Sequence, residues 1–306
     1  MNGILIIDKP EGITSHDVVA RCRRILQTKR IGHTGTLDPF ATGVMVILIG
    51  KATRLAQFLD KDAKEYEAIV RLGFETETGD RTGEPRIANG ERRDVSIEEI
   101  ESVLEDFRGE IEQTPPMYSA KKVEGKKLYQ LARKGLEIER EPVKVTNYEL
   151  RITNYELRKQ KNDFGLLTSD FGLKVLCSAG TYIRTLAEDI GKKLGTGAHL
   201  AELRRTKAGK FAVENSVTLE ELEKIVAEEN LARSLISMND AVSHLYEMRL
   251  SVEEIEKIKN GVKLNKNLDV ISNREFIRLI DENDNLQAIG IYDASEKVIL
   301  PKLVLV

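Results

Sequence analysis

Tryptophan is absent from this sequence, cysteine occurs only twice, and no apolar run reaches the roughly 18 residues that a membrane helix needs. We therefore expect no membrane span. Residues 1–12 lack the basic start and long apolar core of a signal peptide. Cys22 and Cys177 stand alone and form no metal-binding spacing. Together these absences predict reduced thiols and a cytoplasmic protein.

Motifs that bind cofactors or metals are also missing. The sequence contains no P-loop, no Gly-x-Gly-x-x-Gly and no His-Glu-x-x-His. Its four histidines are widely spaced, at His16, His33, His199 and His244. We therefore expect a functional site that uses neither a cofactor nor a metal ion.

A net charge of −3 excludes a histone-like bulk attraction to nucleic acid, but it leaves room for a local basic face. Charges of opposite sign are in fact segregated along the chain. Basic residues gather in 21–30, 121–134 and 204–210, and acidic residues gather in 96–112, 218–229 and 253–256. This pattern favours a one-sided surface for a polyanion, although a merely solvated face would give the same pattern.

Apolar periodicity predicts strands and helices in a mixed order. We expect strands at 3–7, 44–49, 65–72 and 173–177, short helices at 52–59 and 126–134, and a loop over 75–95. A helix should follow Thr14 and Ser15, and another should span 183–194 and end at Gly195. Capping boxes predict three further helix starts, at Ser96 with Glu99, Thr218 with Glu221, and Ser251 with Glu254.

A domain boundary is expected near residue 240. Beyond it the sequence predicts one capped helix and strands at 275–280, 286–292 and 297–305. A module of this size, made mostly of short strands, is typical of a small barrel-like domain.

A tandem repeat interrupts the middle of the chain. VTNYELR at 145–151 is followed at once by ITNYELR at 152–158, and DFGL at 163–166 recurs at 170–173. Solenoids need longer units, so we interpret the repeat as a duplication that lengthens a hairpin. Side chains alternate along a strand, and a spacing of seven therefore places equivalent residues on opposite faces. The two copies should not be interchangeable within one continuous strand.

The most informative segment is IGHTGTLDPFATG at 31–43. Its three glycines allow close approach of a ligand. Asp38 precedes a proline, which disfavours helix and suits a carboxylate presented from a loop. From these residues alone, Asp38 is either a nucleophile or acid–base group, or simply a turn former.

Four other residues could share this site. Arg184 follows a Gly-containing turn and would keep a neighbouring carboxylate ionised. His33, Tyr66 and Tyr182 are further candidates for contact with a substrate. Three of them also have a plain structural alternative: a helix-end cation for Arg184, a core strand residue for Tyr66 and a loop hydrogen-bonder for His33.

Six collinear segments resemble the TruB-type tRNA pseudouridine-55 synthases of bacteria. The clearest is GHTGTLDPFATGVMVILIGKATRL, and the segments lie at 5–19, 32–55, 64–84, 113–135, 177–211 and 237–245. The resemblance covers nearly all of 1–245. The remaining residues are similar, more loosely, to a PUA-like RNA-binding module.

The resemblance implies a role for each matching residue. Asp38 matches the catalytic aspartate, Arg184 the arginine that pairs with it, and Tyr66 the tyrosine that stacks under the target base. His33 matches a histidine near the flipped nucleotide, Tyr182 a tyrosine that contacts the base, and Leu203 a residue that lines the uracil pocket. Lys9 and Pro10 match a motif that supports the active-site loop. The duplication at 145–173 is the one clear departure from the family pattern.

The implied fold is α+β, with a largely antiparallel mixed sheet flanked by helices and a small C-terminal β-rich PUA-like domain. The implied domains are a catalytic domain at 1–240 and an RNA-binding domain at 241–306. The implied substrate is the T-stem-loop of tRNA, with phosphates held near 121–134 and 204–210. We expect a monomer that requires no protein partner.

The implied reaction isomerises uridine to pseudouridine after the base is flipped out of its stack. Attack of Asp38 on C1′, a glycal intermediate and attack on C6 all remain open. Three other functions also remain open: the same fold in a guide-RNA complex, a non-catalytic RNA chaperone, and an Asp-nucleophile hydrolase. The short C-terminal module argues against the first, the intact candidate residues against the second, and the missing second carboxylate against the third.

Overall fold

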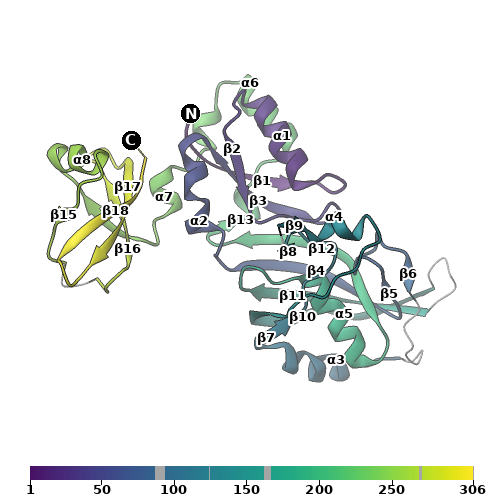
Figure 1. The fold of residues 1–306 in the computed structure, drawn as a ribbon. Coiled ribbons are helices and arrows are strands. Elements are labelled where there is room, and N and C mark those ends of the chain that lie inside the picture. Colours follow the sequence, from purple (N-terminus) through teal and green to yellow (C-terminus); the bar gives the residue numbers. More distant parts are fainter. Residues whose placement is uncertain (87–93, 124, 162–166, 269–270, 306) are drawn as a thin grey trace.

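The computed structural model describes residues 1–86, 94–123, 125–161, 167–268 and 271–305. These residues form two large sheets and two two-stranded ones, and helices flank the large sheets (Figure 1). The strands are β1 (Gly3–Lys9), β2 (Ile31–Thr34), β3 (Thr42–Ile49), β4 (Lys64–Leu72), β5 (Glu75–Thr76), β6 (Pro85–Arg86), β7 (Gly109–Gln113), β8 (Lys122–Val123), β9 (Lys126–Lys127), β10 (Val143–Lys161), β11 (Leu167–Cys177), β12 (Ala198–Ala208), β13 (Phe211–Ala212), β14 (Tyr246–Arg249), β15 (Leu264–Asn265), β16 (Phe276–Ile280), β17 (Leu286–Asp293) and β18 (Val298–Val304).

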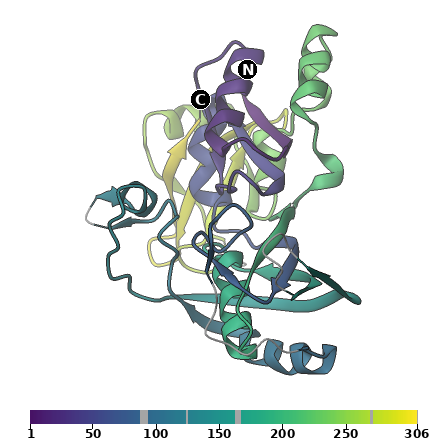
Figure 2. The same ribbon diagram turned by 90° about the vertical axis from the view of Figure 1, so that its right-hand side faces the viewer.

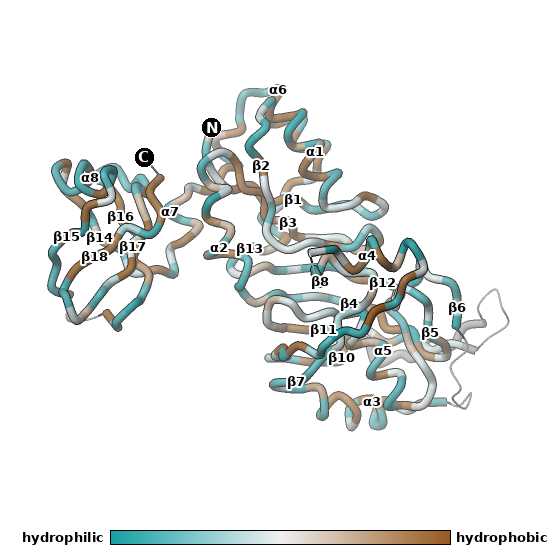
Figure 3. The backbone as a smooth tube through the Cα atoms, viewed as in Figure 1, coloured by the Kyte–Doolittle hydropathy of each residue, from teal (hydrophilic) through white to brown (hydrophobic). Residues whose placement is uncertain are grey.

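The α-helices are α1 (Ser15–Ile25), α2 (Ala56–Leu59), α3 (Ile97–Leu104), α4 (Leu128–Ala132), α5 (Ile183–Leu194), α6 (Leu219–Ala227), α7 (Met238–Ala241) and α8 (Val252–Lys259). In the part of the chain just defined, no helix is long and apolar enough to cross a membrane. Helix α8 instead carries hydrophilic and hydrophobic residues side by side (Figure 3).

The larger sheet has nine strands, with the central order β1-β3-β12-β4-β11-β10-β7. Its neighbouring strands are antiparallel except at the join between β3 and β12. There the strands run parallel over two pairs only, Arg204 with Thr42 and Arg205 with Gly43. The observed fold is thus the predicted α+β mixed sheet, and its short parallel join carries the residues of the candidate site.

Two pairs of helices pack against this sheet through apolar side chains. Helix α1 contacts α6, and α3 contacts α5. Their buried residues form one cluster with Ile7 of β1, Ile47 of β3 and Val70 of β4. The predicted capping boxes begin α3, α6 and α8 as expected, and Thr14 with Asp17 caps α1 in the same way. Helix α5 ends at Gly195, whose φ of 73° is the left-handed conformation expected of a C-terminal glycine.

The smaller sheet has the order β14-β16-β17-β18-β15 and lies on the side of α2 and α7, away from α3 and α5 (Figure 1). In the turned view its yellow strands lie behind the purple N-terminal strands (Figure 2). Ile280 and Ile289 of this sheet join one apolar cluster with Ile6 and Val46 of the larger sheet. The expected boundary at 240 falls within α7, between the two sheets.

Several segments differ from the predicted elements. Residues 31–34 form strand β2 on the edge of β3 instead of a loop, and β7 and β12 were not predicted. Residues 50–55 form a 3₁₀ helix before the short α2, and 126–127 form β9 before α4. Residues 75–86 contain the short strands β5 and β6 rather than loop alone, and 87–93 lie outside the described residues.

The duplicated segment forms part of the β10–β11 hairpin, as predicted. Between Asn147 and Glu149 a bulge adds one unpaired residue to β10. The extra residue reverses the alternation of faces, so that Val145 and Ile152, seven positions apart, are both buried. The expected swap of faces is therefore wrong for the first residue of each copy. Residues 163–166, the first DFGL copy, lie outside the described residues.

Candidate active site

The Asp38 loop, residues 35–41, connects β2 to β3 and is held by side chains from other elements. The Ser15 hydroxyl donates to the carbonyl of Leu37 at 3.0 Å and accepts from its amide at 2.8 Å. The Lys9 Nζ donates to the carbonyls of Pro39 and Ala41 at 3.1 and 2.6 Å. Both Ser15 and Lys9 are buried. The backbone on either side of Asp38 is therefore fixed before any ligand binds.

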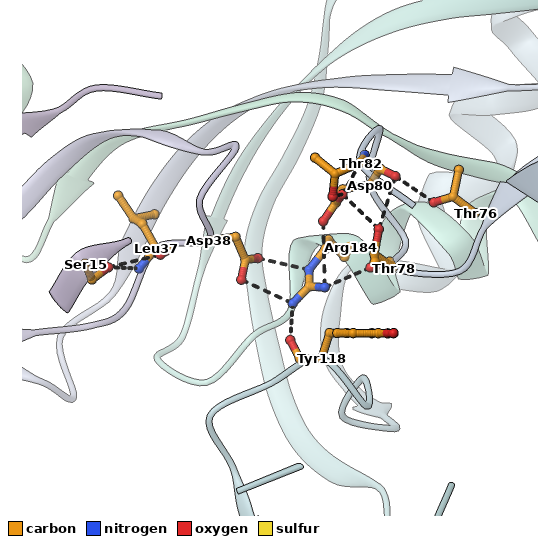
Figure 4. A network of polar contacts seen from close by, with 9 residues as sticks. All are labelled: Ser15, Leu37, Asp38, Thr76, Thr78, Asp80, Thr82, Tyr118 and Arg184. Carbon is orange, nitrogen blue, oxygen red and sulfur yellow. Dashed lines mark hydrogen bonds and ion pairs between the residues drawn. The ribbon is translucent and has the colours of Figure 1, made fainter. Parts of the chain in front are cut away.

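Arg184, at the start of α5, faces Asp38 across the site (Figure 4). Its Nε lies 2.9 Å from one carboxylate oxygen of Asp38, and one terminal nitrogen lies 3.3 Å from the other. The same guanidinium donates to the carbonyls of Thr78 at 2.8 Å and Tyr118 at 2.7 Å. A fork-shaped pairing of this kind fixes the orientation of the carboxylate as well as its charge.

Asp80 lies behind the guanidinium. One of its oxygens is 3.8 Å from Arg184, and its carboxylate accepts hydrogen bonds from the hydroxyls of Thr78 and Thr82 and from the Thr82 amide. The side chains of Asp80 and Arg184 are each 5% exposed, whereas Asp38 is 33% exposed. Arg184 is therefore a buried cation between two carboxylates, of which only Asp38 reaches solvent.

A pocket of about 260 Å³ opens beside Asp38. Five of the six residues singled out from the sequence line it, namely Asp38, Tyr66, Tyr182, Arg184 and Leu203. They come from the β2–β3 loop, β4, the start of α5 and β12, so distant segments of the chain form one concave surface.

His33 is the exception among the predicted site residues. It lies on β2 and does not line this pocket. Its ring packs edge-on to that of His16 at a centroid distance of 6.0 Å. Burial lowers the pKa of His33, and the nearby His16 lowers it further. Its buried Nδ1 has no hydrogen-bond partner among the described residues.

Burial and charge act in opposite directions on the Asp38 carboxyl. Burial raises its pKa above the ordinary value, while the Arg184 guanidinium lowers it. Asp80 raises the pKa again, and Lys9 lowers it. For Lys9, burial lowers the pKa to about 8, so the amine stays mostly protonated at neutral pH. Two cations thus favour the ionised form of Asp38, which a nucleophile requires.

Tyr182 is held through its backbone rather than its side chain. The buried Gln113, at the end of β7, accepts from the Tyr182 amide at 3.0 Å and donates to its carbonyl at 3.3 Å. Tyr182 begins α5 without a side-chain cap. Gln113 therefore fixes the turn that carries both Tyr182 and Arg184.

Sequence reasoning missed Ser15, Asp80, Gln113 and Arg205 as parts of this site. Ser15 and Gln113 act on residues 22 and 69 positions away, and no local pattern marks such contacts. Asp80 had a weak signal, because it stands in a run of glycine, threonine and acidic residues at 75–84. Within the described residues, no group of three or more His, Cys, Asp or Glu could hold a metal ion.

Comparison with known proteins agrees with this geometry. The family model described as TruB family pseudouridylate synthase (N terminal domain) matches residues 23–183. A second, described as tRNA pseudouridylate synthase B C-terminal domain, matches 184–243. A Bacillus cereus protein named tRNA pseudouridine synthase B is 42% identical over 289 residues, which cover 94% of this chain and 92% of that protein. A Geobacillus thermodenitrificans protein of the same name is 47% identical over 264 residues, 86% of each chain.

Solved structures show the same architecture. A chain in the crystal structure of a Cbf5-Nop10-Gar1 complex matches with a TM-score of 0.74 and 28% identity, over 99% of this chain and 85% of that one. A chain in the structure of an H/ACA RNP bound to a substrate RNA containing 2′-deoxyuridine matches with a TM-score of 0.72 and 26% identity. The match covers 99% of this chain and 85% of that one. Fold and site together define an enzyme of the pseudouridine synthase class, an isomerase. The chain belongs to the TruB family of pseudouridylate synthases.

Proposed function

We propose that this chain is a tRNA pseudouridine synthase that isomerises uridine 55 in the T-loop, with Asp38 as the catalytic nucleophile. The curated relatives named tRNA pseudouridine synthase B support the substrate. The observation that carries the assignment of Asp38 is its ion pair with Arg184 at the wall of the pocket. A partly exposed carboxylate, whose ionised form a buried guanidinium favours, is the reactive group that this surface offers.

The other lining residues would bind the flipped base. We propose that the ring of Tyr66 stacks under the uracil, that Tyr182 contacts its edge, and that Leu203 closes the pocket wall. His33, outside the pocket, would contact the flipped nucleotide from the side of β2. These roles account for the aromatic and apolar part of the pocket wall, beside the carboxylate that pairs with Arg184.

The RNA backbone would lie over the segment 121–134. Lys122 and Lys126 are exposed there, and they form no ion pair within the described ranges. The basic group at 204–210 is mostly engaged by the protein's own groups instead: Arg204 pairs with Asp8 at 2.6 Å, Lys207 pairs with Glu65 at 3.6 Å, and Arg205 is buried. We therefore assign phosphate contacts to 121–134 first.

We propose a catalytic domain at 1–240 and an RNA-binding domain at 241–306, in a cytoplasmic monomer that needs no protein partner. The similar Cbf5 structure is a complex with Nop10 and Gar1, so this point needs its own test. Pure chain should modify unmodified tRNA unaided. A requirement for a second protein or a guide RNA would contradict the proposal.

The decisive experiment replaces Asp38 by Asn, which keeps the shape of the side chain and removes its charge. Asp38→Asn should abolish pseudouridine formation at position 55 and leave tRNA affinity within a few-fold of wild type. The matched control is Asp60→Asn, because Asp60 lines the same pocket without contacting Arg184. The readouts are pseudouridine mapping and a filter-binding titration. Appreciable turnover by Asp38→Asn, or modification at another uridine, would refute the assignment.

A further inference from the structure

Arg205 is a buried cation without a carboxylate partner. Its side chain is among the largest that are fully buried, with 1% of the residue exposed. The guanidinium forms no ion pair with any carboxylate in the described ranges of the chain, whereas Arg184 at the start of α5 and the neighbouring Arg204 on β12 do. A buried charge is normally paired, because desolvation of an isolated ion is costly. The missing partner therefore points to a negative charge that arrives with the substrate or develops on it.

The neighbours of Arg205 place it at the proposed base site. Arg205 stands directly opposite Tyr66 in the β12–β4 ladder. Burial raises the pKa of the Tyr66 hydroxyl, and the charge of Arg205 lowers it by a smaller amount. Its Nε donates to the carbonyl of Val44 at 2.8 Å and a terminal nitrogen donates to that of Gly35 at 3.0 Å. Arg205 also lines the pocket that contains Asp38.

A second buried cation lies beside it. Lys64 precedes Tyr66 by two residues on β4, so both side chains lie on the same face of the strand. Lys64 is 5% exposed, lines the same pocket and donates to the carbonyls of Asp60 and Asp62 at 3.3 and 2.5 Å. Within the described residues its ammonium forms no ion pair, although burial lowers its pKa more than the charges of Asp62 and Asp60 raise it. Arg205 and Lys64 thus place two positive charges in the pocket that Tyr66 also lines.

We propose that Arg205, assisted by Lys64, stabilises the negative charge that the uracil carries when it separates from the ribose. The inference rests on the proposed reaction at Asp38 and adds the group that receives the departing charge. Fixed charges aimed at a developing anion in a water-poor site are among the strongest sources of catalysis.

The electron balance of the reaction requires such a charge. When the N1–C1′ bond breaks, both bonding electrons remain on the base, which becomes an anion spread over its ring nitrogens and carbonyl oxygens. Asp38 supplies the opposing electron pair at C1′, or removes the C2′ proton on the glycal route. The base then turns and C5 bonds to C1′, which releases the Asp38 carboxylate or, on the glycal route, returns the proton from Asp38 to C2′. The proton lost from C5 balances the proton that N1 gains.

A merely structural role explains these contacts less well. The carbonyls of Gly35 and Val44 need hydrogen-bond donors, and a neutral amide would serve as well as a guanidinium. Arginine instead remains charged when buried, at the cost of its desolvation. The charge itself, rather than the hydrogen bonds, is the feature that needs a function.

The test compares two substrates that differ in the stability of the base anion. Target tRNA is prepared with uridine or with 5-fluorouridine at position 55, because the electron-withdrawing fluorine stabilises the anion. Loss of the N1–C1′ linkage is followed in single turnovers by nucleoside mass spectrometry. Arg205→Gln should slow loss of the N1–C1′ linkage in the uridine RNA about 10²-fold, since removal of one stabilising group lowers a rate by about that much. Arg205→Gln should slow bond breaking in the 5-fluorouridine RNA clearly less. The rate of Arg205→Lys with uridine RNA should lie between the rates of wild type and Arg205→Gln.

Controls separate this role from folding and from the proposed function. Lys64→Gln should also slow the uridine RNA more than the 5-fluorouridine RNA, but by a smaller factor. This variant keeps the inference testable if the Arg205 variants do not fold. Lys174→Gln, which breaks the Lys174–Glu65 pair at 3.1 Å, should leave both rates unchanged. Equal slowing of both substrates in Arg205→Gln and Lys64→Gln would overturn this inference alone. A wild-type chain that converts neither RNA would overturn the proposed function and this inference with it.

Discussion

At the scale of single residues, the proposed nucleophile is positioned by side chains that never touch it. Ser15 binds both backbone polar groups of Leu37, and Lys9 binds the carbonyls that follow Asp38. These donors and acceptors are buried, so each lost hydrogen bond leaves an unpaired polar group inside the protein. The orientation of the Asp38 side chain toward Arg184 therefore depends on residues from β1 and α1.

Ser15→Ala should lower kcat by roughly 10- to 100-fold with KM for tRNA changed by less than about 3-fold. Small displacements of a reacting group cost this much, and Ser15 does not line the pocket. Steady-state kinetics and a thermal melt measure both consequences. A loss of stability without a fall in kcat would contradict the positioning role.

Thr14→Ala is the matched control. It removes the N-cap of the same helix α1 but leaves the contacts of Ser15 with Leu37 intact. It should cost about 1 kcal/mol of stability, as cap substitutions do, while kcat stays near wild type.

The sequence led to the reactive residues but not to the residues that support them. Asp38 and Arg184 lie in segments whose order of residue types resembles a family, so their pairing was expected. In the sequence Ser15 is an ordinary helix start, and Gln113 lies in a strand, β7, that was not predicted. Their roles become visible only when the fold brings their partners close. Such contacts depend on tertiary structure, which no local pattern encodes.

At the scale of elements, the short parallel join between β3 and β12 holds the two parts of the site together. Gly43 has a φ of 101°, and a Cβ there would lie 2.2 Å from the Arg205 carbonyl oxygen. Only glycine allows the strands to approach this closely. The spacing between the Asp38 loop and Arg205 is therefore set by one missing side chain.

Gly43→Ala should be clearly more destabilising than Gly12→Ala. Gly12 has a similar φ of 86° but open space around it, so alanine there adds only backbone strain of roughly 1–2 kcal/mol. At Gly43 the clash should add roughly 1–3 kcal/mol more. Urea denaturation of both variants measures the difference. Equal losses of unfolding free energy in the two variants would show that β3 and β12 can move apart without an energetic cost.

Helix ends were predictable because their signals are local: four residues suffice for each capping box. Strands β2 and β12 were missed for the opposite reason. Residues 198–201 of β12 are all buried, so the strand shows no alternation there, and β2 is only four residues long. Their pairing partners, rather than their own residues, determine their structure.

At the scale of the whole molecule, the two sheets share one core. Ile289 of β17 is fully buried in a cluster with β1 and β3, whereas Ile299 of β18 is buried in a cluster confined to the C-terminal part of the chain. The ring of Phe58 in α2 also contacts that of Phe276 in β16 at 5.1 Å. Deletion of 246–306 would therefore expose apolar surface of the larger sheet in addition to removing the proposed RNA contacts.

Ile289→Ala and Ile299→Ala should each cost about 2–5 kcal/mol, as deletions in a packed core do. Only Ile289→Ala should also increase amide hydrogen exchange in β1 and β3, because only its cluster includes them. Exchange measured by mass spectrometry distinguishes the two. Increased exchange in β3 with Ile299→Ala, or none with Ile289→Ala, would mean that the sheets open independently.

The pairing of Asp38 with Arg184 also has a consequence for the order of folding. The two residues are 146 positions apart, and they meet only after β4, β10, β11 and β12 have assembled beside β3. Contacts between such distant segments form late, because closing a long chain segment costs entropy before any contact repays it. The growing chain on the ribosome therefore has no active site until α5 has been synthesised and docked, and recovery of activity on refolding should follow the slowest phase.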